Sequence, residues 1–473
     1  MARRDFRPGE GGAKINGATD RRAARITERQ RYFAHLDPMR AMPLIGLFAF
    51  ALACTSPRPV ADHDPDYWVP QELVCEDRVY SPTISAVQFF KKGFELAPPV
   101  LELDAQDPLV LRFDDLQPDP EQLSYTIVHC DAQWRPSELM TNQYITGAPT
   151  DFVSPAEQSR MTLQPFIAYT VEVPNEFMRP AIAGNYLLKI FRNGDQEDLL
   201  LTRRFLVFEQ RVDIQASVQA SRDVELRDIA QQIDLVVRYP GVQVNDPFSD
   251  ISVTVLQNMR WDDARTGFKP KFLRDQELVY DYPKEGLFLG GSEWRVYDLK
   301  NTRYVTNEIQ RIARSPDGLE EVFLLPDQKR NIRVYVEEPD LNGKHFVRND
   351  QMDGDPLGAD HTWVDFTLKL DGPVSSGDIY VYGGFSDFQC KKEYRMVWMP
   401  DLKAYTLRAK IKQGFVNYCY AYLPAGADKP DLTTIEGSHF QTENDYLILV
   451  YVKDYSLRCD RLLGLRFVNS RRG

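Results

Sequence analysis

The stretch YLLKIFRNGDQEDLLLTRRFLVF, residues 186–208, contains two short apolar runs separated by a turn cluster that includes Asn193, Gly194 and Asp195. Each run is about one strand long and rich in aromatic and branched side chains, as is typical of β-strands. Similar runs occur along the chain at LVLRF (109–113), IDLVVRY (233–239), ISVTVL (251–256), IRVYV (332–336), DIYVYGGF (378–385), YCYAYL (418–423) and YLILVYV (446–452). Because long helical periodicity is scarce, the sequence predicts an all-β protein of serial antiparallel, immunoglobulin-like β-sandwiches.

Composition limits the possible functions. A chain of 473 residues with 43% hydrophobic residues can bury more than one core. The formal net charge of −12 argues against the basic surface that nucleic acid binding requires. We therefore expect several domains and no nucleic acid partner.

The segment MRAMPLIGLFAFALAC, residues 39–54, resembles a secretory signal that ends in a lipoprotein box. Its apolar run is shorter than the roughly 20 residues of a membrane span and suits the core of a signal peptide. We expect translation to begin at Met39 or Met42, and Cys54 to carry a lipid anchor. Ala51 stands where lipoprotein boxes usually have Leu, so a soluble exported protein or an unmodified Cys54 remain alternatives.

Changes in composition predict the domain boundaries. Residues 1–53 form an upstream segment and signal peptide, and the polar, Pro-containing residues 54–71 form a tether. A first β-sandwich is expected over 72–210, a second β-domain over 211–358 and a C-terminal sandwich over 359–473. The last boundary is placed in a stretch rich in Gly and Asp, residues 340–360.

The run HCDAQW, residues 129–134, brings a histidine, a thiol and a carboxylate together in sequence. On a strand, however, His129 and Cys130 project to opposite faces, so they cannot easily serve one site. The chain contains no GxSxG elbow, and its other histidines have no recognisable partner motif. We therefore interpret His129 as a packing residue and expect no enzymatic activity, no cofactor and no small-molecule substrate.

The sequence around this run resembles the first domain of the Plug protein family of the type IX secretion system of Bacteroidota. The likeness rests on FDDL (113–116), SYTIVHCD (124–131), TVEVPNEFMRPAIAGNYLLKIFRNGD (170–195), LTRRFLVFEQRV (201–212), QNMRWDDARTGFKPKFL (257–273) and GGSEWRVYDLKNTRY (290–304). The resemblance implies an exported, non-enzymatic protein. Together with the lipoprotein box at Cys54, it predicts a periplasmic location with a lipid anchor at the inner face of the outer membrane. Such proteins close the periplasmic mouth of the outer-membrane translocon barrel, the expected partner, when no substrate is passing.

Polar loops that carry Trp and Arg are candidates for partner contacts, because these residue types are enriched at binding hot spots. The candidates are Trp134, Arg260, Trp261, Asp262, Asp263, Arg265 and Trp294. The alternative is that Trp261 packs under its own loop while Arg265 pairs with Asp263, and that Trp294 belongs to the core.

The C-terminal block resembles an early-set immunoglobulin-like module of the glycogen-binding type. Gly383 and Phe385 match its Gly-x-Phe-x-x-Trp turn, and Phe388 replaces the Trp. A carbohydrate-binding envelope lipoprotein is therefore the alternative function.

The acidic run NDQMDGDPLGAD, residues 349–360, follows a calcium-loop spacing only loosely. We expect an ordinary turn there and no metal. The cysteines other than Cys54 are odd in number, and spacing leaves their pairing open, although Cys390 and Cys419 could meet.

Overall fold

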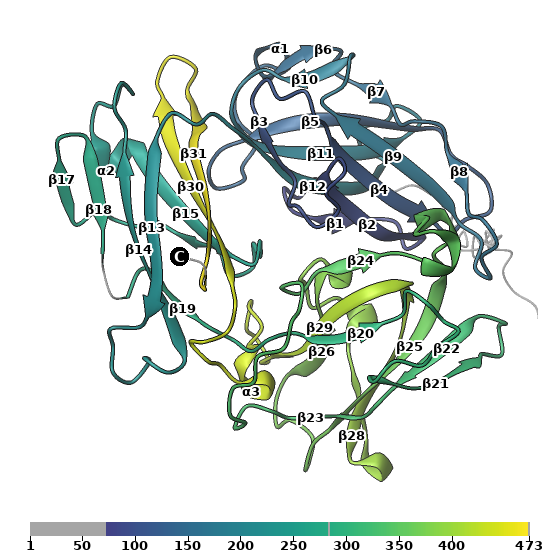
Figure 1. Cartoon of the computed structure of the whole chain (residues 1–473). Coiled ribbons are helices and arrows are strands. Elements are labelled where there is room, and N and C mark those ends of the chain that lie inside the picture. Colours follow the sequence, from purple (N-terminus) through teal and green to yellow (C-terminus); the bar gives the residue numbers. More distant parts are fainter. Residues whose placement is uncertain (1–71, 282–283, 472–473) are drawn as a thin grey trace, which may run out of the picture. The chain divides into compact units, whose positions relative to one another are not determined.

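The computed structural model describes residues 72–281 and 284–471 (Figure 1). The expected signal peptide and tether, together with Cys54, lie outside these residues. The regular secondary structure of the described chain is almost entirely β-strand, which confirms the predicted all-β class. None of its short helices has the length and apolar character needed to cross a membrane.

The first sandwich packs two antiparallel sheets around one core. One sheet has the order β1 (Arg78–Val79), β12 (Leu199–Phe208), β11 (Gly184–Arg192), β5 (Leu123–Cys130) and β7 (Asp151–Phe152), with β3 (Val100–Glu102) parallel to β12. The other sheet has the order β2 (Ile84–Lys91), β4 (Leu109–Asp115), β9 (Ile167–Val173) and β8 (Glu157–Gln158). β6 (Ile145–Gly147) and β10 (Met178–Pro180) form a small ribbon beside α1 (Thr141–Tyr144).

The second sandwich is completed from the end of the chain. Its first sheet has the order β13 (Asp213–Ala220), β14 (Ala230–Arg238), β18 (Glu277–Tyr280) and β17 (Phe272–Arg274), with β19 (Leu287–Leu289) on β14. Its second sheet has the order β16 (Arg265–Thr266), β15 (Ile251–Gln257), β30 (Asp445–Asp454) and β31 (Cys459–Asn469), and α2 (Pro247–Asp250) precedes β15. In Figure 1 the yellow β30 and β31 lie among these teal strands.

The third sandwich also pairs strands that are distant in sequence. One sheet has the order β20 (Arg295–Asp298), β29 (Gly414–Leu423) and β24 (His345–Val347), with β26 (Asp378–Tyr382) on β29. The other has the order β21 (Ile309–Arg314), β22 (Glu320–Leu324), β25 (His361–Lys369), β28 (Ala404–Lys412) and β27 (Val397–Met399), with β23 (Asp327–Gln328) on β25. Its short helices are η1 (Asp350–Met352), η2 (Pro356–Gly358), η3 (Gly384–Ser386), η4 (Lys392–Tyr394), η5 (Pro400–Leu402) and α3 (Thr433–Glu436).

The sheet pairing departs from the expected domain division. The boundary near residue 210 falls between β12 and β13, which belong to different sheets. The division at 358/359 does not separate sheets, because β22 pairs with β25 across it and β30 returns to β15. We propose instead that residues 211–290 and 444–471 form the second unit and residues 291–443 the third.

The two runs of the opening stretch, which form β11 and β12, are mostly apolar because their strands are buried on both faces. On β11, Tyr186, Leu188 and Ile190 enter the core of the first sandwich. Leu187 points the other way, into a cluster with Leu447 and Leu462 of the second sandwich. Strands covered on both faces lose the alternation of polar and apolar residues. These strands therefore hold the first two sandwiches together.

His129 lies on β5, fully buried and in edge contact with the Tyr186 ring at 5.2 Å between centroids. Cys130 belongs to the cluster on the opposite face, as the strand period predicts. Burial lowers the pKa of His129 to about 4, which keeps the ring neutral near pH 7. The structure thus makes His129 a packing residue.

Gly184 gives a test of this packing. A Cβ on Gly184 would come within 2.2 Å of His129 Nε2, so the ring occupies the space of a side chain. We expect Gly184→Ala to lower the free energy of unfolding by about 1–2 kcal/mol through overpacking. Gly372→Ala is the control, because nothing lies within 4 Å of its Cβ position. Urea unfolding that shows equal stabilities for the two variants would contradict this account.

Candidate docking surface and interdomain junction

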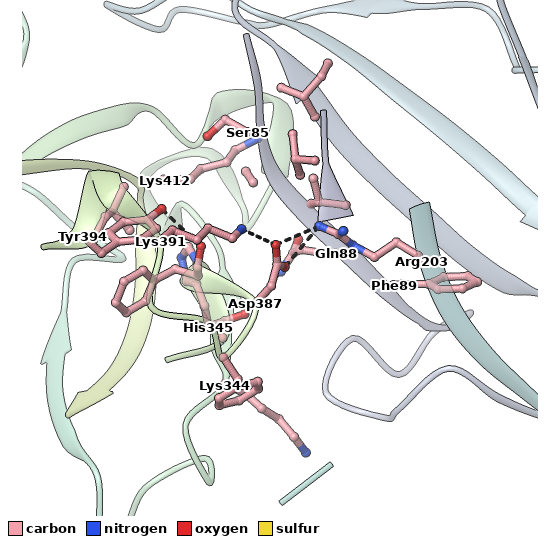
Figure 2. Close-up of a pocket in the computed structure, with 18 of the residues that line it drawn as sticks. Ser85, Gln88, Phe89, Arg203, Lys344, His345, Asp387, Lys391, Tyr394 and Lys412 are labelled. Atoms are coloured by element: carbon pink, nitrogen blue, oxygen red, sulfur yellow. Dashed lines mark hydrogen bonds and ion pairs between the residues drawn. The ribbon is translucent and has the colours of Figure 1, made fainter. Parts of the chain in front are cut away.

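A cavity of about 650 Å³ lies where residues of the three sandwiches meet (Figure 2). Its walls include β2 of the first sandwich, Asn258 and Met259 of the second, and Lys344 and His345 of the third. Figure 2 shows Arg203, Lys391 and Lys412 reaching toward it from different elements. The cavity therefore lies between the packed sandwiches, and no single sandwich contains it.

Asp387 joins two of the cations at this cavity. The Arg203 guanidinium donates to both carboxylate oxygens of Asp387, at 3.1 and 3.2 Å, and Lys391 Nζ donates to Oδ2 at 2.5 Å. Burial alone would raise the pKa of Asp387, but Arg203 and Lys391 outweigh it and lower that pKa. Since Arg203 lies on β12 and Asp387 follows η3, this network connects the first sandwich to the third.

A second buried network lies behind the cavity wall. Asp114 of β4 contacts Lys412 Nζ of β28, and its Oδ2 lies 2.8 Å from His361 Nε2 of β25. All three side chains are almost completely buried. Burial would raise the pKa of Asp114, but Lys412 and His361 lower it, so the carboxylate stays ionised. Removing one member of such a cluster leaves an uncompensated buried charge.

Asp360 extends the same interface. Its carboxylate accepts hydrogen bonds from the backbone N–H groups of Leu163, at 2.5 Å, and Gln164, at 3.0 Å. Asn349 and Asp355 of the same acidic run cap η1 and η2 by accepting from Gln351 and Leu357. The side-chain oxygens of Asn349 and Asp355 therefore stabilise turns, and those of Asp360 stabilise the interface between the first and third sandwiches. In the described part of the chain no three His, Cys, Asp or Glu side chains are grouped to hold a metal ion.

Two of the predicted contact residues form an aromatic pair between the first and second sandwiches. The Trp134 and Trp261 rings meet edge to face at 4.9 Å. The Arg204 guanidinium lies 4.7 Å from the Trp134 ring centroid and 5.4 Å from that of Trp261. Such cation–π contacts are favourable when the ring faces are shielded from water. The structure therefore gives this pair an internal role.

Arg260 and Asp262 connect the second sandwich to Tyr382 of the third, whereas Trp294 packs within the third sandwich. Arg260 pairs with Asp262 at 2.7 Å, and Tyr382 donates a hydrogen bond to Asp262 at 2.7 Å. The Trp294 ring stacks on Tyr382 at 6.3 Å between centroids. Phe388 packs on the same two rings, at 5.9 Å from each, so it does not form an isolated exposed sugar platform.

Burial corrects the expectation of a partner contact for three of these side chains. Trp134 and Arg260 are each less than a tenth exposed, because they fill the joints between sandwiches. Trp294 is equally buried among the rings of the third sandwich, which is the core position expected as its alternative. Arg265 is exposed and pairs with Asp263 at 3.3 Å, which is the alternative expected for that pair. Arg265 and Asp263 stay predicted partner contacts.

A more exposed candidate surface is the segment 331–339, which we name the extended segment. Ile332, Val334 and Val336 are 90, 88 and 65% exposed. The sequence predicts a strand here, but the segment belongs to no sheet. Within the described residues, the backbone N–H and C=O groups of these three residues have no hydrogen-bond partner. The predicted strand is thus wrong as a paired element, because no strand edge of the described chain reaches it.

The side chain of Tyr335 holds the extended segment on the body of the protein. Its hydroxyl donates to Glu293 and accepts from Arg471, and its ring lies 5.6 Å from that of His439. Arg330 anchors the start of the segment through Glu436 at 2.6 Å. Since alternate residues of extended chain point in opposite directions, fixing Tyr335 inward turns Val334 and Val336 outward.

Together the fold and these contacts define an all-β protein of three sandwiches, the second completed by strands from the end of the chain, whose buried charges and aromatic rings join its parts. Residues 84–209 match the family model described as "Type 9 secretion system plug protein 1st domain". This part of the chain, the first sandwich, therefore belongs to that family, as the resemblance implied. The match connects the protein with the type 9 secretion system, and with a structural or secretion role in the cell envelope.

Solved structures support the fold along most of the chain. A crystal structure of a hypothetical protein from Parabacteroides merdae ATCC 43184 aligns with a TM-score of 0.80 and 26% identity. The alignment covers 84% of this chain and 100% of that one. No curated protein matches the chain.

Proposed function

We propose that this protein is a non-enzymatic plug that docks on the periplasmic mouth of the type IX outer-membrane translocon barrel and seals it when no substrate is passing. The family match of residues 84–209 carries this proposal. The buried ion pairs and aromatic contacts between the sandwiches support it, because a seal must keep its shape under load. Rigid scaffolds also present binding loops at little entropic cost.

The extended segment is the surface that we propose contacts the barrel protein. Its unpaired backbone and outward apolar side chains suit addition to the strand edge of another polypeptide. Burying these side chains removes apolar area from water, which is favourable by about 25 cal/mol per Å². Arg333 and Glu338 are exposed, and their opposite charges give the extended segment a direction that a partner can read.

Co-purification tests the proposed function. The tagged protein, extracted from outer membranes in mild detergent, should bring down a very large barrel protein. Recovery of the tagged protein without any barrel protein under these gentle conditions would overturn the proposal. A pull-down on insoluble polysaccharides tests the carbohydrate-binding alternative, which requires retention by the glycan.

A charge in the extended segment is expected to weaken docking. Val334→Asp should reduce the barrel protein recovered by about tenfold, since a carboxylate would be buried at the contact. The matched control is Val224→Asp, because Val224 is 84% exposed in a different loop. Equal recovery with both variants, at unchanged thermal stability, would exclude the extended segment as the docking surface.

We also propose that the protein is attached to the periplasmic face of the outer membrane by a lipid on Cys54. Labelling with a radioactive fatty acid should mark the wild-type chain but not Cys54→Ser. Absence of label from both chains would reject the anchor, and would leave the docking proposal open to its own test.

A further inference from the structure

Cys75 and Cys130 are brought together from distant parts of the first sandwich. Cys75 precedes β1, and Cys130 ends β5. Both pack in the cluster between the first and second sandwiches, where Cys130 is fully buried and Cys75 is half-buried. The two thiols are close enough for each to shift the pKa of the other, and Cys130 Sγ also donates to the Val128 carbonyl oxygen at 3.9 Å. Among the described cysteines, these two influence each other's pKa, whereas no other cysteine acts on Cys390, Cys419 or Cys459.

The backbone around Cys75 is held in place for this contact. Arg204 Nε and Nη2 donate to the Cys75 carbonyl oxygen at 2.9 and 2.6 Å. The Arg204 N–H donates to Asp77 Oδ1 at 2.7 Å, and Arg78 pairs with Thr202 across β1 and β12. Cys130 is held by the register of β5 against β11, opposite Asn185. Two neighbouring thiols on fixed backbone in one cluster need little movement to reach disulfide geometry.

We propose that Cys75 and Cys130 form a structural disulfide in the mature protein. The proposal rests on the envelope location, because disulfides form and persist in oxidising compartments. The bond would link the segment that follows residues 54–71 to a central strand of the first sandwich. A pull on that segment would then be transmitted to β5 through a covalent bond, instead of through the two residue pairs of β1.

The chemistry of the pair gives the two sulfurs different roles. Cys130 and the nearby Arg204 lower the pKa of Cys75, against the effect of burial. The Cys75 thiolate would attack the S–S bond of an oxidant, either a small disulfide or a thiol–disulfide oxidoreductase. The S–S bond of the oxidant breaks and one thiol leaves. Cys130 then loses its proton and displaces the second thiol, so the two protein thiols are oxidised and the oxidant disulfide is reduced.

The other described cysteines provide controls. Cys390 and Cys419 share a cluster with Trp294, but no sulfur contact joins them, and burial raises the pKa of Cys390 to about 12. Burial likewise raises the pKa of Cys459 to about 11. The Cys390–Cys419 pairing that spacing left open therefore has less support than the pair of Cys75 and Cys130.

Mass spectrometry tests the proposal without depending on the plug function. The purified full chain carrying Cys54→Ser is incubated with oxidised glutathione, alkylated and digested. We expect to detect two peptides linked through Cys75 and Cys130. Alkylation of both residues after complete oxidation would show that their thiols are free and would overturn the proposal. A disulfide between either residue and another cysteine would also overturn it.

Thermal unfolding provides the second measurement. Oxidation should raise Tm by about 5–10 °C, because it closes a long loop in the unfolded chain. A reducing agent should reverse the shift, and Cys75→Ser should abolish it. Cys390→Ser should retain the full shift, and loss of the shift in that variant would contradict the assignment.

Discussion

Replacing Lys412 with Met is expected to lower the free energy of unfolding by about 3–5 kcal/mol. The substitution keeps the length of the side chain but removes the cation that contacts Asp114. Asp114 would remain with His361, whose pKa is lowered by burial and whose ring therefore resists taking up the missing charge. A carboxylate that is almost fully buried would lack its main partner.

Lys410→Met is the matched control for this prediction. Lys410 lies two residues earlier on β28, where its ammonium donates to Gln164 at 2.9 Å from a half-buried position. We expect a loss below about 1 kcal/mol, because solvent screens partly exposed charges. Chemical denaturation of both variants at pH 7 measures the difference. Equal losses of unfolding free energy in the two variants would contradict the prediction that the buried Asp114 cluster stabilises the junction.

The stability of the protein is expected to fall steeply as the pH drops from 6.5 toward 4. In the folded chain the pKa of His129 is about 4, whereas in the unfolded chain a histidine has a pKa near 6.5. Between these values the unfolded state binds more protons, so acid favours unfolding. The contribution of the neutral, buried His129 ring to the free energy of unfolding is fully present above pH 6.5. About 2 kcal/mol of that contribution is lost at pH 5 and about 3 kcal/mol at pH 4.

Urea unfolding of the wild type and His129→Gln at pH 7 and pH 5 tests this assignment. The variant loses packing against Tyr186 and should be less stable at pH 7, but its stability should depend less on pH by about 2 kcal/mol. His439→Gln is the comparison, because the His439 ring is only half-buried and its substitution should leave most of the pH dependence. An unchanged pH dependence in His129→Gln would contradict a buried neutral ring.

The sequence by itself determined the local character of the chain. Short apolar runs bounded by turn residues gave strands at β4, β11, β14, β15 and β30, because strand periodicity and turn chemistry act over a few residues. The same periodicity placed His129 and Cys130 on opposite faces of β5. The likeness around residues 113–212 also led to the family that the match of residues 84–209 shows.

Only the tertiary structure decided which strands meet. β30 pairs with β15, nearly two hundred residues away, and no local pattern encodes that choice. Trp134, Arg260 and Trp294 are of residue types enriched at contacts, yet Trp134 and Arg260 fill joints between sandwiches and Trp294 lies in the core of the third. Conversely, residues 332–336 have the composition of a strand and lie unpaired on the surface. Propensity depends on the neighbouring residues, whereas pairing and burial depend on which distant surfaces the completed fold brings together.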